Sequence, residues 1–223
     1  MNVPSLNEQF SPSTLLTVVL QNHALLIDLL FDLLQRIPAI AKLPGIYEVL
    51  AYEAELELLD TKGKHAVYRK RQEVRFIQDN IIAYQDTAWG DGDIFASYRC
   101  SPGAEVDRYR EGSRYHVLIS LRETKNRNDN EVIHVERGIR NGFVNATEEF
   151  QVDIDHRTRL LCLRLVLPGE RVVRQVTLIE QHGNRTVRLS TDHRQMLPDG
   201  RCLYRWTTTA PRMYETYILR WEW

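Results

Sequence analysis

Residues 50–76, LAYEAELELLDTKGKHAVYRKRQEVRF, decide the fold of this chain. Apolar residues alternate with glutamates over 50–58, and with charged residues again over 66–76. Asp60-Thr61-Lys62-Gly63 between them has the composition of a turn. Side chains point alternately to the two faces of a strand, so a period of two predicts an antiparallel hairpin with one core face and one solvent face. The predicted core rows are Leu50, Tyr52, Ala54, Leu56 and Leu58, then Ala66, Tyr68, Val74 and Phe76.

The solvent faces of this hairpin carry opposite charges. Glutamates at 53, 55 and 57 occupy the first predicted strand, and arginines at 69, 71 and 75 occupy the second. Facing rows of this kind form cross-strand ion pairs that contribute a few tenths of a kcal/mol each. We therefore interpret the two rows as solvated faces.

Strand-like stretches recur to the end of the chain and are separated by turn residues. A spacing of about 8–12 residues between strands is typical of an all-β sandwich or barrel. We predict an antiparallel β-sandwich, Ig-like or jelly-roll-like, of about 10–12 strands. The proposed domains are an N-terminal helical segment, 1–45, and a β-sandwich, 46–223. The remaining predicted strands are 81–89, 94–100, 115–121, 132–139, 150–154, 160–167, 172–181, 185–189, 202–208 and 213–223.

The segment between Pro12 and Pro38 is predicted to be one amphipathic-to-apolar helix. Ser11 and Pro12 are helix-start residues, and Pro38 stops the pattern. Its polar residues fall within an arc of about 60°, which is too narrow for a helix lying on the surface of its own domain. Its apolar residues form a row with alternating three- and four-residue steps, as in helix bundles. This predicted seam is Leu16, Val19, His23, Leu26, Leu30, Leu33 and Ile37.

The sequence leaves three possible surfaces that could cover the apolar face of that helix. It can dock to a partner protein or to a second copy of the chain, or it can pack on its own β domain. A membrane is disfavoured without being excluded, because Asp28, Asp32 and Arg36 would each cost a few kcal/mol in a bilayer. We expect docking to a protein partner or self-association.

Composition limits the class of protein. The chain has 223 residues, 43% of them hydrophobic, and a formal net charge of -1. Such usage is that of an ordinary globular protein with a sizeable core. A nearly neutral chain lacks the basic surface of a general nucleic-acid binder, so no nucleic acid is expected as a partner.

The cysteines and the N-terminus bear on the compartment. Cys100, Cys162 and Cys202 are odd in number and widely spaced, which argues against a disulfide framework or a cysteine metal site. The N-terminus lacks the basic and small-residue features of a secretory signal. We predict a cytoplasmic protein without a cofactor.

Two groups of residues are weak candidates for a ligand site. Asp153, Asp155 and His156 could hold a metal ion for hydrolysis, but a solvated strand end is the favoured interpretation of these residues. Arg108, Arg110 and Arg114 alternate with tyrosines and could bind an anion or stack on a base. Their bland interpretation is a solvent-facing strand with extended arginines.

Sequence motifs give little support for catalysis. The chain contains no G-x-S-x-G elbow, P-loop or dinucleotide-binding glycine pattern. The leading hypothesis is a non-catalytic interaction or scaffold module that docks through its helix. The alternatives are a metal-dependent hydrolase on a β-sandwich and a membrane-associated effector that uses the apolar helix.

Overall fold

The hairpin predicted from residues 50–76 lies at the centre of the fold. Strands β1 (Tyr47–Leu58) and β2 (His65–Phe76) pair antiparallel, with Leu56 opposite Tyr68. Their charged rows meet as expected, since Arg69 Nη1 bonds Glu55 at 3.0 Å and Arg71 Nη1 bonds Glu53 at 3.1 Å. The other face of each strand is buried, which confirms the predicted alternation.

The computed structural model describes residues 45–223. The helix predicted between Pro12 and Pro38, with its whole seam from Leu16 to Ile37, lies outside the described residues. The proposed domain boundary at 45/46 also stays a prediction. Within the described part of the chain, no helix is long and apolar enough to cross a membrane.

The β1–β2 hairpin belongs to a seven-stranded sheet, the large sheet, with the order β12-β13-β9-β1-β2-β7-β4. Its pairs are antiparallel except for β1 and β9, which run parallel with Leu56 opposite Leu165. Its other strands are β4 (Asp93–Ser101), β7 (Asn130–Arg140), β9 (Leu161–Leu167), β12 (Arg194–Met196) and β13 (Cys202–Thr208).

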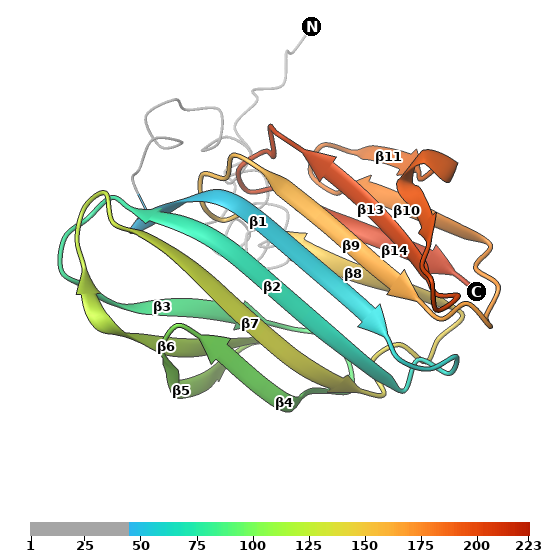
Figure 1. The fold of residues 1–223 in the computed structure, drawn as a ribbon, viewed down its shortest axis with the longest axis horizontal. Coiled ribbons are helices and arrows are strands. Elements are labelled where there is room, and N and C mark those ends of the chain that lie inside the picture. Colours follow the sequence, from blue (N-terminus) through green and yellow to red (C-terminus); the bar gives the residue numbers. More distant parts are fainter. Residues whose placement is uncertain (1–44) are drawn as a thin grey trace, which may run out of the picture. The chain divides into compact units, whose positions relative to one another are not determined.

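Two smaller sheets lie behind the large sheet (Figure 1). The β8 sheet has the order β11-β10-β14-β8, and the β3 sheet has the order β3-β6-β5. Strand β8 is an edge strand of the first sheet and β3 is an edge strand of the second. The two strands are not hydrogen-bonded to each other. A short 3-10 helix, Thr191–His193, precedes β12. The strands are β3 (Ile81–Ala88), β5 (Ala104–Glu111), β6 (Arg114–Lys125), β8 (Thr147–Asp153), β10 (Gln175–Glu180), β11 (Arg185–Arg188) and β14 (Thr216–Glu222).

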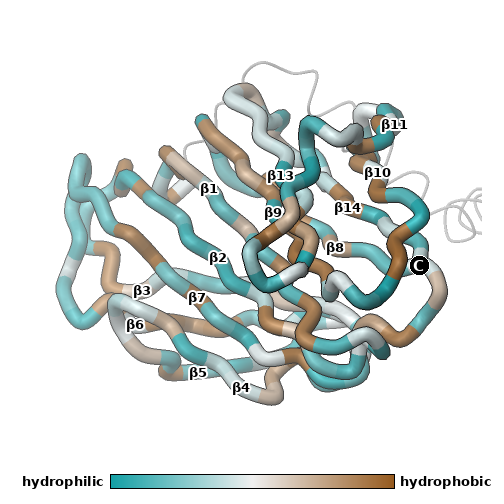
Figure 2. The backbone as a smooth tube through the Cα atoms, turned by 45° about the vertical axis from the view of Figure 1, so that its right-hand side comes forward, coloured by the Kyte–Doolittle hydropathy of each residue, from teal (hydrophilic) through white to brown (hydrophobic). Residues whose placement is uncertain are grey.

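The core fills the space between the layers. Among the largest fully buried side chains are Phe76, Leu163 and Trp221, from β2, β9 and β14. Hydrophobic and hydrophilic residues alternate along many of the strands in Figure 2, as expected for sheets with one buried face. The prediction of a nearly all-β domain with antiparallel sheets is confirmed. The purely antiparallel pattern is corrected at one place, the β1–β9 pair.

Candidate ligand-binding cavity

A cavity of about 390 Å³ lies where the two smaller sheets separate. The large sheet contributes residues of β1, β2 and β7, and the edge strands β3 and β8 contribute the opposite walls. Tyr52, Tyr68, Trp89 and Phe150 supply aromatic surface. Since β3 and β8 do not pair, side chains replace the missing backbone ladder at this junction, and the space between them stays open.

Three charged residues stand in rows that are otherwise apolar. Lys70 lies in the buried row of β2, Asp86 in that of β3, and Arg137 in that of β7 between Val135 and Ile139. All three are less than a tenth exposed. A buried charge is costly unless it is paired, so each of these positions needs an explanation.

Lys70 and Asp86 form a buried ion pair, so each compensates the charge of the other. The Lys70 ammonium pairs with Asp86 and donates a hydrogen bond to the Tyr84 hydroxyl at 2.9 Å. The Tyr84 hydroxyl in turn donates to Gln72 Oε1 at 2.6 Å. Burial is the largest single influence and lowers the pKa of Lys70, but the charge and hydrogen bond of Asp86, together with Tyr68 and Tyr47, raise that pKa above its ordinary value. Lys70 is therefore a protonated structural cation and not a free amine nucleophile.

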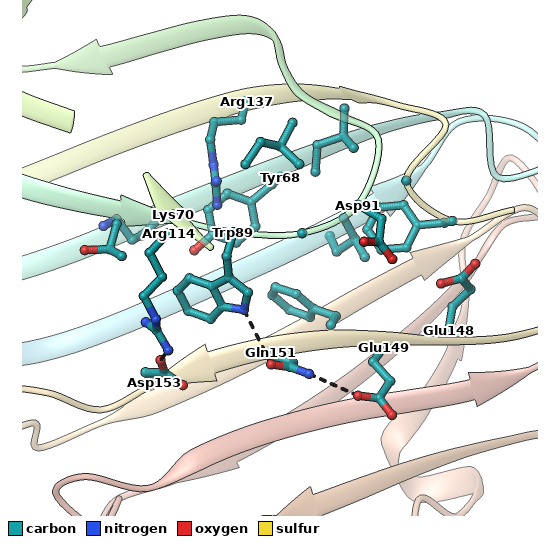
Figure 3. A pocket seen from close by; sticks show the side chains of 18 of the residues that line it. Tyr68, Lys70, Trp89, Asp91, Arg114, Arg137, Glu148, Glu149, Gln151 and Asp153 are labelled. Carbon is teal, nitrogen blue, oxygen red and sulfur yellow. Dashed lines mark hydrogen bonds and ion pairs between the residues drawn. The ribbon is translucent and has the colours of Figure 1, made fainter. Parts of the chain in front are cut away.

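Arg137 has no such partner in the part of the chain that the structure describes. Its side chain is 7% exposed, and its Nε and Nη1 atoms are buried without a hydrogen-bond partner among the described residues. Its guanidinium carbon lies 4.4 Å from the centre of the Tyr68 ring. Figure 3 shows the side chain extending from its strand toward Tyr68 and Trp89. A guanidinium cannot lose its proton in a protein, so the positive charge remains uncompensated by hydrogen bonds.

Side-chain contacts join the β3 sheet to the β8 sheet at one wall of the cavity (Figure 3). Arg114, at the start of β6, donates to Asp153 Oδ2 at 2.6 Å, and its guanidinium carbon lies 4.3 Å from the Trp89 ring. Trp89 Nε1 donates to Gln151 Oε1 at 3.4 Å. These contacts hold the β3 and β8 sheets together without backbone pairing.

The far end of the cavity is acidic. In Figure 3, Asp91 and Glu148 lie on the opposite side from Lys70 and Arg114. Glu148 is 7% exposed and accepts a hydrogen bond from the Asn145 amide at 2.5 Å. Burial raises the pKa of Glu148 above its ordinary value, and the charge of Asp91 adds to this effect against the Asn145 hydrogen bond. The cavity thus has a basic and an acidic end.

The structure separates the first group of sequence candidates. Asp153 and Asp155 line the cavity, whereas His156 stacks on Tyr47 with ring centres 4.2 Å apart. His156 Nδ1 lies 2.8 Å from Asp155, whose side chain is 70% exposed. Asp153 accepts hydrogen bonds from Arg114 and from the Thr216 hydroxyl, the latter at 2.7 Å. Over residues 45–223 no three His, Cys, Asp or Glu side chains are grouped so as to hold a metal ion.

The second group is separated as well. Arg114 lines the cavity, but Arg108 and Arg110 do not. Arg108 pairs with Glu105 at 2.8 Å and covers the Phe95 ring at 3.9 Å. Arg110 donates to the Gly112 carbonyl at 2.9 Å. These two contacts agree with the simpler prediction of extended arginines on a solvent-facing strand.

Sequence reasoning missed the residues that distinguish this cavity. The predicted core row of the second strand runs through Tyr68 and Val74, and the structure places Lys70 and Gln72 in the same buried row. Arg137 likewise interrupts an apolar row, Ile133-x-Val135-x-Arg137-x-Ile139. A charged residue in the apolar register of a strand is the signal that would have identified them.

Comparisons with known proteins give no family. No family model matches the chain, and no curated protein matches it. Among solved structures, the M1 zinc metallopeptidase from Deinococcus radiodurans is similar at 10% sequence identity with a TM-score of 0.47. The match covers 79% of this chain but only 42% of that protein. A similarity this low carries no argument about activity.

Proposed function

We propose that residues 46–223 are a β-sandwich whose interior cavity binds a small organic molecule. The cavity itself is the observation that carries this proposal. Ligand sites are concave spaces of about 300–1,000 Å³, lined by apolar and aromatic side chains with a few placed polar groups. The present cavity has about 390 Å³ and combines Tyr52, Trp89 and Phe150 with amide and charged side chains.

The position of the cavity also favours binding. Its walls come from three sheets, and Trp89 and Arg114 on one side meet Gln151 and Asp153 on the other through side chains alone. The Arg114–Asp153 ion pair is partly exposed, and ion pairs of this kind are weak. Breaking it to admit a molecule therefore costs little free energy. A binding role also agrees with Lys70, whose ammonium is held by Asp86.

A neutral fluorescent dye tests the proposal. Prodan has a naphthalene core of suitable size, and its emission shifts to the blue in an apolar site. The full chain is expected to shift and enhance that emission with saturation, whereas Thr87→Trp, which fills the cavity wall, abolishes the change. Thr177→Trp is the matched control, because Thr177 is a strand threonine of similar partial exposure outside the cavity. An unchanged emission with the wild-type chain, or equal binding by Thr87→Trp, contradicts the proposal.

Docking through the N-terminal segment is a separate proposal. The motivating feature is the apolar seam between Leu16 and Ile37, which favours a protein partner or a second copy of the chain. Light scattering of the full chain and of seam variants such as Leu26→Glu tests it. A monomer in both cases argues against self-association.

A cytoplasmic location is likewise proposed from the cysteine usage alone.

A further inference from the structure

We propose that the ligand of this cavity carries a carboxylate and that Arg137 recognises it. This inference rests on the proposed binding function and names the chemical class of the ligand. Its starting point is a buried cation, 7% exposed, whose Nε and Nη1 have no hydrogen-bond partner among residues 45–223. Arg137 lines the cavity and has no carboxylate partner among these residues, so the charge of a bound anion can compensate its guanidinium.

The charges around the cavity show why Arg137 differs from its neighbours. Lys70 is paired with Asp86, and Arg114 is paired with Asp153 at 2.6 Å. Each of those cations is neutralised by an adjacent carboxylate, whereas Arg137 contacts the faces of aromatic rings, Tyr68 at 4.4 Å and Phe95 at 6.0 Å. Arg137 is therefore the one cation of the cavity lining that has no carboxylate partner among residues 45–223.

One uncompensated charge favours a monoanion. A phosphate monoester carries close to two negative charges at neutral pH, so Arg137 alone would leave part of that charge buried without compensation. A carboxylate carries a single charge, which balances the single charge of one guanidinium, and hydrogen bonds between two charged groups are stronger than those between neutral ones.

The acidic end sets the orientation of the bound molecule. Asp91 and Glu148 lie across the cavity from the basic groups and would repel a carboxylate placed beside them (Figure 3). The body of the ligand then lies between Tyr68, Trp89 and Phe150, which offer aromatic surface. The expected ligand is an apolar or aromatic monocarboxylate with its carboxylate toward Arg137.

A matched pair of probes separates this inference from the binding function itself. 2-Naphthoate and 2-naphthamide have the same ring system and nearly the same shape, but only the first is charged. Competition with prodan on the full chain is expected to show naphthoate binding at least about tenfold more tightly than naphthamide. Equal affinities overturn the carboxylate inference while the binding function stands. If prodan and both competitors fail to bind, the binding function itself is refuted.

Variants assign the preference to the residue. Arg137→Met keeps an extended side chain without charge, and it is expected to erase the preference, so that naphthoate and naphthamide bind with affinities within about twofold of each other. Arg137→Lys keeps the charge without the planar donors and is expected to be intermediate. Arg140→Met, an exposed arginine of the same strand outside the cavity, is the control and keeps the full preference. A full preference retained by Arg137→Met refutes the assignment, and the comparison of the two probes on the wild-type chain stands even where a variant fails to fold.

Discussion

Replacing Asp86 by alanine removes the carboxylate that pairs with the Lys70 ammonium inside the domain. Lys70 is 6% exposed and Asp86 is 1% exposed, so water cannot readily take the place of the lost partner. Asp86 also accepts a hydrogen bond from the Tyr98 hydroxyl at 3.3 Å. Removing one partner of a buried ion pair costs about 3–5 kcal/mol, because the other charge is left uncompensated.

Urea denaturation of the full chain, followed by far-ultraviolet circular dichroism, measures this cost. Asp86→Ala is expected to lower the free energy of unfolding by about 3–5 kcal/mol. The double variant Lys70→Met/Asp86→Leu removes both charges and is expected to recover most of that loss, to within about 1 kcal/mol of the wild type. Asp153→Ala is the control, since its side chain is 21% exposed and its partner Arg114 is 46% exposed.

The sign of the pH dependence follows from the raised pKa of Lys70. The folded state binds this proton more tightly than the unfolded state, whose lysines have a pKa of about 10.4. The stabilisation is therefore complete below pH 10 and is lost as the pH rises toward the higher pKa of the folded state. A loss below about 1 kcal/mol in Asp86→Ala, or a double variant less stable than the single one, would refute the reasoning about this buried pair.

Further variants test other parts of the structure. The pKa of Glu148 is raised in the folded state, so its ionisation opposes folding as the pH rises past its ordinary value. Thermal denaturation of Glu148→Gln is expected to give a higher Tm than the wild type at pH 7 and the same Tm at pH 4, and equal Tm values at both would contradict this. A double-mutant cycle on Arg114 and Asp153 is expected to give a coupling of about 0.2–1 kcal/mol, because both groups are partly exposed; a coupling above about 2 kcal/mol would show that solvent screens this pair less than its exposure implies. Gly63→Ala places a Cβ on a backbone carbonyl of the loop after β7, whereas Gly112→Ala meets open space at a similar positive φ, so chemical denaturation is expected to find the first clearly more destabilising; equal losses would mean that the β1–β2 turn can move away from that loop.

The period-two rows could be predicted because they depend only on local alternation. The antiparallel pairing of β1 with β2 and the burial of Leu56 and Tyr68 follow from residues 50–76 alone. Strand β5 was not predicted, because Ala104–Glu111 is exposed along nearly its whole length and has no apolar row to detect. The predicted strands 115–121 and 132–139 are longer in the structure, since β6 continues to Lys125 and β7 begins at Asn130.

The cavity could not be predicted in the same way. It depends on the separation of two sheets at β3 and β8, and strand order is not encoded in the alternation of any one strand. The parallel contact between β1 and β9 joins segments about a hundred residues apart and has no local signal. The charged positions in the core rows, Lys70, Asp86 and Arg137, were visible in the sequence, but their meaning appears only once the facing strands are known.

Intermolecular nuclear Overhauser effects from 2-naphthoate to the aromatic protons of the full chain test whether the cavity between the large sheet and the edge strands β3 and β8 is a ligand site. A probe bound in this cavity is expected to give contacts to the rings of Tyr68 and Trp89, which both line it. Contacts confined to exposed rings such as Tyr109, which is 47% exposed and outside the cavity, would contradict it.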